Sequence, residues 1–361
     1  MSKAAQLAAL IGSGQAQGDR NLVINGAMQV AQRGSVTGVT SGYGGADRFQ
    51  FSRGGACTID MSQSTDVPSG QGFPNSMKLD VNTADSSLAA GDFALFTQKI
   101  EAQNTQHLKK GTASASSVVA SFWIKSPITG TYILELYDFD NSRHINKSYT
   151  INTANTFEYK TITFAGDTSG ALNNDNGTGL QLGWWLAAGS TFSGGTLQTD
   201  WGADTAANRA VGQVNAVGDA ANNIFITGVQ LEIGDVATPF EHEDFGTTLR
   251  KCQRYFAKSW SQGSAVTTNA GVIGAACVGN ANRAFGNVFW PVTMRAAPTV
   301  IWYSGSTGTA NKWRNASQGT DITAASAISG IGQSGYGFVL SSGIVGITDT
   351  LQGHYQAVAE L

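Results

Sequence analysis

The chain has 361 residues, and its 22 Lys and Arg and 25 Asp and Glu make up 13% of it, where an average soluble domain carries about a quarter. A net charge of −3 with scattered basic residues argues against a nucleic-acid-binding protein, which shows a clustered basic surface. The hydrophobic fraction of 41% is enough for a packed core, which argues against intrinsic disorder. The length suggests two domains.

The N-terminal segment has the pattern of a short helix. Apolar residues recur at helical spacing in residues 2–12, and Gly12 and Gly14 end the pattern. A helix of this length is marginal alone in water, so it either docks on another protein or on a symmetry mate, or it is a frayed terminus. The segment lacks the apolar core and cleavage site of a secretory signal. No apolar run approaches the roughly 18 residues of a membrane span. We therefore expect synthesis in a cytoplasm and no membrane insertion.

From residue 21 to about residue 240, apolar and polar residues alternate with the period of a half-buried strand. The alternating segments are residues 117–125, 131–138, 160–164, 180–187 and 223–233. Turn signals rich in Gly, Asn and Asp separate them, with no helical repeat between. This arrangement predicts an antiparallel β-sandwich.

Near residue 246 the pattern changes. Apolar residues in residues 247–260 recur at spacings of three and four, which predicts a helix. Pro239 and Gly246 bracket a domain boundary just before it. Short apolar runs then return at residues 270–278, 287–292, 299–303, 335–340 and 352–359. We expect a first β domain over residues 21–245, followed by a linking helix and a smaller C-terminal β domain over residues 246–361.

Few residues have the spacing of a metal or catalytic site. Cys57, Cys252 and Cys277 are too far apart in the chain for a zinc motif or a disulfide framework, and we expect small buried thiols. The four histidines are also far apart, so neither a metal nor a cofactor is expected. The oxygen-rich turn at residues 173–176 is not an EF-hand, because Leu186 stands where that motif needs a glutamate. An isolated Ca²⁺ in such a loop remains open.

Aromatic side chains on the polar faces of the strands are more informative. Trp123, Tyr137 and Trp185 fall opposite the apolar face of their segments, and Gln181 and Glu135 share those polar faces. Such rings can pack on the apolar face of a sugar while neighbouring polar groups bond its hydroxyls. We therefore take these five residues as candidate carbohydrate contacts. In the alternative, the rings pack against another subunit, the C-terminal domain or a covering loop.

A series of segments along the chain carries a family resemblance. It begins with NLVINGAMQVAQRG at residues 21–34 and continues through ADRF at 46–49, SFWIKS at 121–126, TITFAGDTSG at 161–170, residues 173–179, ITGVQLEIG at 226–234, ATPFEH at 237–242 and CQRYF at 252–256. In this order they resemble phage tail-fibre and virion proteins with a carbohydrate-binding-like jelly roll. Residues 289–299 look like the segment that opens the distal domain of such proteins.

The resemblance implies a jelly-roll domain and a structural virion protein of a bacteriophage, most often a homotrimeric tail fibre. Residues 1–20 would anchor the chain to other tail or virion proteins. The β modules would serve host attachment and receptor binding at the host surface polysaccharide. The family supplies no catalytic residue to carry over, so we expect no enzyme, and we expect a place in the virion, in the tail.

Two alternatives differ in class or in place. A tailspike-type polysaccharide depolymerase would need a long repetitive solenoid, and the chain shows no fixed period of about 20–50 residues. The second alternative is a head fibre or decoration protein, which would also be a virion component but would be located at the head and not at the tail. If instead the distal domain meets the receptor, the expected contacts are Trp302, Tyr303 and Trp313.

Overall fold

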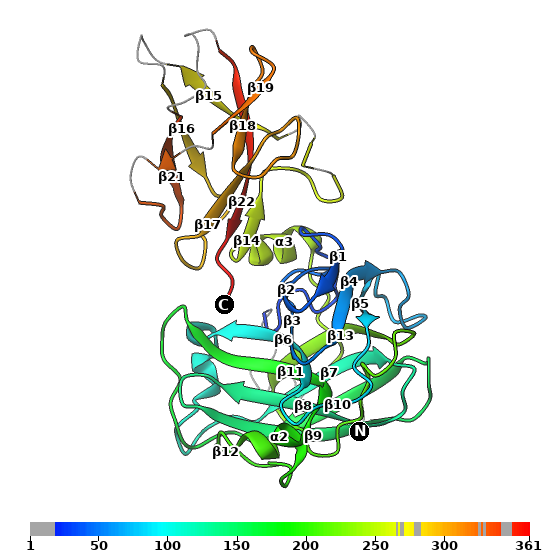
Figure 1. The fold of residues 1–361 in the computed structure, drawn as a ribbon. Coiled ribbons are helices and arrows are strands. Elements are labelled where there is room, and N and C mark those ends of the chain that lie inside the picture. Colours follow the sequence, from blue (N-terminus) through cyan, green and yellow to red (C-terminus); the bar gives the residue numbers. More distant parts are fainter. Residues whose placement is uncertain are drawn as a thin grey trace. The chain divides into compact units, whose positions relative to one another are not determined.

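The computed structural model describes residues 19–264, 266–267, 271–277, 283–323, 326–327, 330–340 and 349–361. The chain divides into two compact units, Met1–Asp244 with Leu361, and Phe245–Glu360 (Figure 1). The helix expected at residues 2–12 lies outside the described residues. In the described part of the chain, no helix has the length and apolar character needed to cross a membrane.

The N-terminal unit is a sandwich of two sheets. The six-stranded sheet has the order β1 (Val36–Val39), β4 (Thr58–Ser64), β5 (Ser76–Thr83), β13 (Asn223–Ile233), β7 (Val118–Lys125) and β10 (Glu158–Phe164). The seven-stranded sheet has the order β12 (Gly202–Ala203), β9 (Arg143–Ile151), β8 (Gly130–Asp138), β11 (Thr178–Ala188), β6 (Phe93–Glu101), β3 (Gln50–Gly54) and β2 (Ser41–Tyr43). All these pairings are antiparallel, so the expected β-sandwich is confirmed.

The core lies between the two sheets and follows from the alternation in sequence. In β7 the inward side chains, which include Phe122 and Ile124, are fully buried, whereas Trp123 and Lys125 point outward. Phe122 meets Trp184 of β11 edge to face, with ring centroids 5.5 Å apart, so the two sheets interlock through aromatic side chains. Each large apolar side chain buried in this way contributes about 1.5–3 kcal/mol.

The outer face of the seven-stranded sheet is covered by its own chain. Residues 189–216, which include α2 (Ser190–Ser193) and η2 (Ala206–Asn208), fold back over β8 and β11. Gln213 accepts a hydrogen bond from the backbone N–H of Ile133 at 2.8 Å, and Phe192 packs on Trp185 with centroids 5.4 Å apart. The centre of this sheet is therefore buried on both faces. A third short helix, η1 (Ala102–Leu108), follows β6.

The last strand of the N-terminal unit is a central one. β13 pairs with β5 on one side and with β7 on the other. The start of the described chain is bound to the same region, because the backbone N–H of Leu22 donates to the Leu231 carbonyl at 2.9 Å and that of Asn21 donates to the Glu241 carboxylate at 3.0 Å.

The C-terminal unit has its own sheet and its own core. Its elements are α3 (Phe245–Gln253), β14 (Phe256–Lys258), β15 (Ile273–Cys277), β16 (Ala284–Phe289), β17 (Thr299–Tyr303), β18 (Lys312–Asn315), β19 (Thr320–Thr323), β20 (Ser326–Ala327), β21 (Gly335–Leu340) and β22 (Leu351–Val358). β22 pairs with β14, β15, β17 and β18. Trp302, Trp313 and Phe338 are central in the core of this unit.

The helix expected at residues 247–260 is wrong in its second half. α3 ends at Gln253, and the backbone of Phe256–Lys258 pairs with β22 as strand β14. The four-residue spacing of Cys252 and Phe256 fits one face of a helix. Phe256 is nevertheless in a strand, where its side chain is buried as well as that of Cys252. The pairing with β22 comes from a distant part of the chain, and such tertiary contacts override a local periodicity.

Candidate functional site

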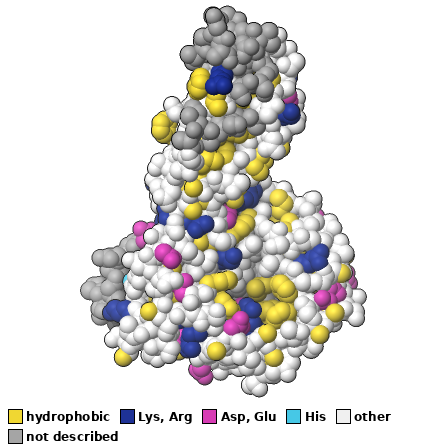
Figure 2. All heavy atoms as spheres, turned by 60° about the vertical axis from the view of Figure 1, so that its left-hand side comes forward, with side chains coloured by type: hydrophobic (Ala, Val, Ile, Leu, Met, Phe, Trp, Pro, Cys, Tyr) yellow, Lys and Arg dark blue, Asp and Glu magenta, His cyan; other side chains and the backbone are white. Residues whose placement is uncertain are grey.

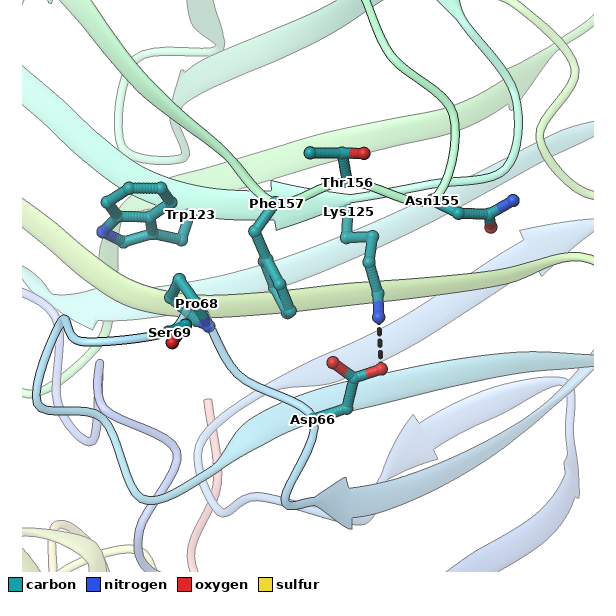
Figure 3. A pocket seen from close by; sticks show the side chains of 8 residues that line it. All are labelled: Asp66, Pro68, Ser69, Trp123, Lys125, Asn155, Thr156 and Phe157. Carbon is teal, nitrogen blue, oxygen red and sulfur yellow. Dashed lines mark hydrogen bonds and ion pairs between the residues drawn. The ribbon is translucent and has the colours of Figure 1, made fainter.

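The outer face of the six-stranded sheet carries a hollow of about 390 Å³. Two of its lining residues, Trp123 and Lys125, belong to β7, and the others come from the connections at residues 65–75 and 152–157 (Figure 3). The lining residues are Asp66, Pro68, Ser69, Trp123, Lys125, Asn155, Thr156 and Phe157. Three segments that are distant in sequence thus meet at one aromatic and polar depression.

Trp123 stands beside a second exposed ring. In the ladder its neighbours are Tyr159 of β10 and Thr227 of β13, so all three share the outer face. The centroids of the Trp123 and Tyr159 rings are 5.3 Å apart, and Tyr159 is 44% exposed. Two neighbouring rings therefore form an aromatic surface next to the hollow.

One cation and one carboxylate lie within the hollow. The Lys125 ammonium forms an ion pair with Asp66 and lies 4.9 Å from the Phe157 ring centroid and 4.2 Å from that of Phe225. The Lys125 side chain is only 14% exposed, whereas that of Asp66 is 48% exposed. The pair leaves no net charge, and the Asp66 carboxylate faces the solvent with capacity to accept hydrogen bonds.

The connection at residues 152–157 is fixed by Glu158, the first residue of β10. The Glu158 carboxylate accepts hydrogen bonds from the backbone N–H groups of Asn152 and Thr153, both at 2.8 Å, and from the Lys160 ammonium at 2.6 Å. Burial raises the pKa of Glu158, but these hydrogen bonds outweigh it and lower the pKa to about 2. Asn155 takes a left-handed backbone conformation, with φ of 56°, and its N–H donates to the Ser126 carbonyl.

The connection at residues 65–75 is held against a bulge in β13. Thr227 donates a hydrogen bond from its hydroxyl to the Asn75 carbonyl at 2.7 Å, and the ladder with β7 shifts register after Thr227. Gly228 in this bulge has φ of 62°, and a Cβ there would lie 2.6 Å from the Phe73 ring. The Phe73 ring therefore needs glycine at this position to reach its place in the loop.

The structure separates the five candidate sugar contacts predicted from the sequence. Trp123 lines the hollow, whereas Tyr137, Gln181, Glu135 and Trp185 lie on the other sheet. Gln181 pairs with Tyr137 and Gly183 with Glu135, so the predicted sharing of a face is confirmed. Trp185 is 1% exposed and Glu135 is fully buried, because residues 189–216 cover this face. Trp185 and Glu135 are thus unavailable to a sugar, and the covering loop that was the alternative is what buries them, whereas Tyr137 is half-buried.

Glu135 is the centre of an internal network. The Arg209 guanidinium binds its two carboxylate oxygens at 2.7 and 2.6 Å, and Asn146 donates to it at 3.1 Å. The same guanidinium lies over the rings of Tyr137 and Trp185, at 4.9 and 5.3 Å from their centroids. These contacts make the group a structural one that attaches the covering segment to the sheet.

The distal candidates are also corrected. Trp302 and Trp313 are 4% and 0% exposed, with ring centroids 4.7 Å apart in the core of the C-terminal unit. Tyr303, the next residue in β17, is half-buried on the opposite face, 5.6 Å from the Trp260 ring. The alternation within β17 therefore places Tyr303 on the face opposite to Trp302, which packs with Trp313 of β18.

The oxygen-rich turn is satisfied by its own surroundings. Asp140 accepts hydrogen bonds from the backbone and side-chain amides of Asn173 at 2.9 and 2.8 Å, and Asp175 accepts one from the Gly177 N–H at 2.8 Å. Within the described ranges no group of three or more His, Cys, Asp or Glu side chains could hold a metal ion. Cys57 is a buried free thiol, and burial raises its pKa to about 11; Cys252 is also buried.

Sequence reasoning missed most of the hollow. Tyr159 carried a usable signal, since it stands on the outward face of the strand that was expected at residues 160–164 and begins at Glu158. Asp66, Asn155 and Phe157 lie in connections, where no periodicity reveals which way a side chain points. On the face of the N-terminal unit that Figure 2 shows, Lys and Arg side chains and Asp and Glu side chains are scattered in small groups among uncharged ones.

No protein-family model matches the chain, and no curated protein matches it. Among solved structures, the Bacteriophage CBA120 tailspike protein 4 enzymatically active domain aligns at a TM-score of 0.34 and 16% identity, covering 60% of this chain and 22% of that one. A CBM4 structure aligns at a TM-score of 0.30 and 12% identity, covering 58% of this chain and 98% of that one. TmCBM61 in complex with β-1,4-galactotriose aligns at a TM-score of 0.30 and 10% identity, covering 60% of this chain and 100% of that one. These likenesses assign neither a ligand nor an activity to this chain.

Proposed function

We propose that the chain is a glycan-binding structural protein of a bacteriophage virion, a trimeric tail fibre that attaches to the particle through residues 1–20 and contacts host surface polysaccharide through its N-terminal β-sandwich. It acts by binding and not by catalysis. The ordered series of segments between residues 21 and 260 supports the virion assignment. The low charge content supports an oligomer, since interface cores are depleted in charged residues.

The hollow at Trp123 is the observation that carries the glycan proposal. Sugar recognition needs an aromatic ring for the apolar face of a pyranose and polar groups around it for the hydroxyls. Trp123 supplies the ring, Asp66 an acceptor, and Lys125 and Asn155 supply donors, all within one depression. Because the ion pair cancels the charge, the preferred ligand is a neutral stretch of polysaccharide.

The proposal is tested by replacing Trp123 with alanine in the full chain. Binding of the purified protein to host cells, and to polysaccharide extracted from them, should weaken about tenfold, because the stacking surface is lost. Phe139→Ala is the control, since Phe139 is an exposed aromatic ring, at 43%, in the connection after β8 on the other sheet. Unchanged binding by the Trp123 variant, with the fold intact by circular dichroism, would exclude this site.

Two further measurements separate the alternatives. Release of oligosaccharides from host polysaccharide by the purified chain would favour a depolymerase over a binding protein. Sedimentation gives the oligomeric state, and a monomer at every concentration would contradict the fibre assignment. Labelling of intact particles with an antibody to the chain would separate a tail fibre from a head fibre.

A further inference from the structure

A second group of charged residues lies inside the N-terminal unit, away from the Trp123 hollow. The Lys110 ammonium is 2.5 Å from the Asp138 carboxylate and 2.9 Å from that of Asp167, and the side chains of the three residues are 5%, 0% and 3% exposed. The Trp201 ring lies over the ammonium at 5.0 Å. The proposed glycan binding uses none of these residues.

The two carboxylates in this group have different cationic partners. Arg143 binds Asp167 through two nitrogens, at 2.8 and 3.0 Å. Burial raises the pKa of Asp167, but the hydrogen bonds from Arg143 and Lys110 outweigh it and keep the pKa below its ordinary value. Asp167 is thus neutralised by Arg143, and Lys110 and Asp138 remain as a nearly dry pair. Condensation of this pair needs a neutral amine, which forms when one proton passes from the Lys110 ammonium to the Asp138 carboxylate across the contact between them.

We propose that Lys110 and Asp138 condense into an intramolecular isopeptide bond. The lone pair of the Lys110 Nζ attacks Cγ of Asp138 and forms the C–N bond. The C–Oδ2 bond then breaks, and Oδ2 leaves as water with the proton it gained from the ammonium and a second proton from the attacking nitrogen. The product is a secondary amide and one water molecule, so the step needs neither an oxidant nor a further reactant.

Neighbouring groups are placed to assist this step. The backbone N–H of Asn141 donates to Oδ1 of Asp138 at 3.0 Å, where negative charge develops in the tetrahedral intermediate. Asp167 contacts the Lys110 Nζ and can carry the second proton from nitrogen to the departing oxygen. The Ser169 and Gly170 carbonyls accept from Nζ at 3.0 and 2.8 Å and hold it beside Asp138.

The bond would close a covalent loop between positions 28 residues apart and join the segment after η1 to the end of β8. Lys110 also lines a surface hollow of about 490 Å³, which gives the released water a way out. Cys57, in the same unit, is a free thiol. An isopeptide bond would provide covalent bracing that forms in a reducing cytoplasm.

The test is the intact mass of the purified full chain under denaturing conditions. The wild-type chain should be lighter than its sequence by the mass of one water molecule. Digestion should yield a branched peptide that joins the fragments containing Lys110 and Asp138. A chain of full sequence mass, or a missing water located elsewhere, would overturn the proposal.

Two variants separate the reaction from simple ion pairing. Lys110→Arg keeps the positive charge but offers no condensable amine, so it should have the full sequence mass and a lower melting temperature. Asp167→Asn keeps the nucleophile and the acid but removes the proton carrier, so the uncondensed fraction should rise in freshly made protein. If both variants show the same missing water as the wild type, neither residue takes part in its loss.

Discussion

At the scale of single residues, Glu158 determines the shape of the Trp123 hollow without lining it. Its carboxylate holds the two backbone N–H groups that open the connection at residues 152–157, and that connection presents Asn155, Thr156 and Phe157. The contribution depends on the ionised carboxylate, which alone accepts all these hydrogen bonds. Because folding lowers the pKa of Glu158, ionisation of this carboxylate stabilises the folded state.

We predict that Glu158→Gln removes an acid-dependent part of the stability. The pKa of Glu158 is lowered from 4.5 to about 2 on folding, so its contribution is fully present above pH 4.5 and is lost as pH falls toward about 2. The difference in melting temperature between wild type and variant should be constant above pH 5 or so and shrink as pH falls through that window. Asp200→Asn, at an exposed carboxylate, is the control and should show no such change.

At the scale of elements, the β13 bulge connects the sheet to the loop beside the site. The register shift after Thr227 places Gly228 in the left-handed region, where its missing Cβ leaves room for the Phe73 ring. Bulges redirect side chains at the rims of binding sites, and here the bulge seats one of the two loops that form the hollow.

Gly228→Ala should destabilise the N-terminal unit by more than backbone strain alone. The strain at positive φ costs about 1–2 kcal/mol, and displacing the Phe73 ring adds about 1–3 kcal/mol as overpacking. Gly38→Ala is the matched control, because Gly38 has φ of 63° and no atom within 4 Å of its added Cβ. Chemical denaturation of both variants measures the difference, and equal losses would mean that the Phe73 ring moves without cost.

The sequence predicted strands well and surfaces poorly, for a physical reason. Alternation records which side chains face the core, so residues 223–233 and 299–303 are strands with the expected bounds. Alternation cannot record what covers the other face. Trp185 has the outward position of a ligand-binding ring, yet residues 189–216 bury it. Asp66 and Asn155 meet at the hollow only because two distant connections converge there.

At the scale of the whole molecule, each unit has a separate hydrophobic core. The first contains Phe122 and Trp184, and the second contains Trp302 and Trp313. Among the residues that the structure describes, the buried side chains of each core come from one unit alone. Separate cores predict that damage to one unit leaves the other folded.

We predict that Trp313→Ala unfolds the C-terminal unit alone. Removing a fully buried tryptophan costs about 3–5 kcal/mol, a large part of the stability of a domain this size. Limited proteolysis during heating should cut the variant within residues 245–360 at a lower temperature while residues 19–244 stay resistant. Trp184→Ala is the reciprocal variant, and loss of both units together in either one would show a single cooperative fold.

The central position of the last strand in each unit has a consequence for how the protein is made. A ribosome adds about 5–20 residues per second, so β13 emerges on the order of 10–50 s after synthesis starts. Until then β5 and β7 lack the partner that lies between them. The second unit repeats the situation, because β22 pairs with four strands that all precede it in the chain. A chain that is cut before β13 or β22 therefore loses an inner strand of a sheet and not an edge strand.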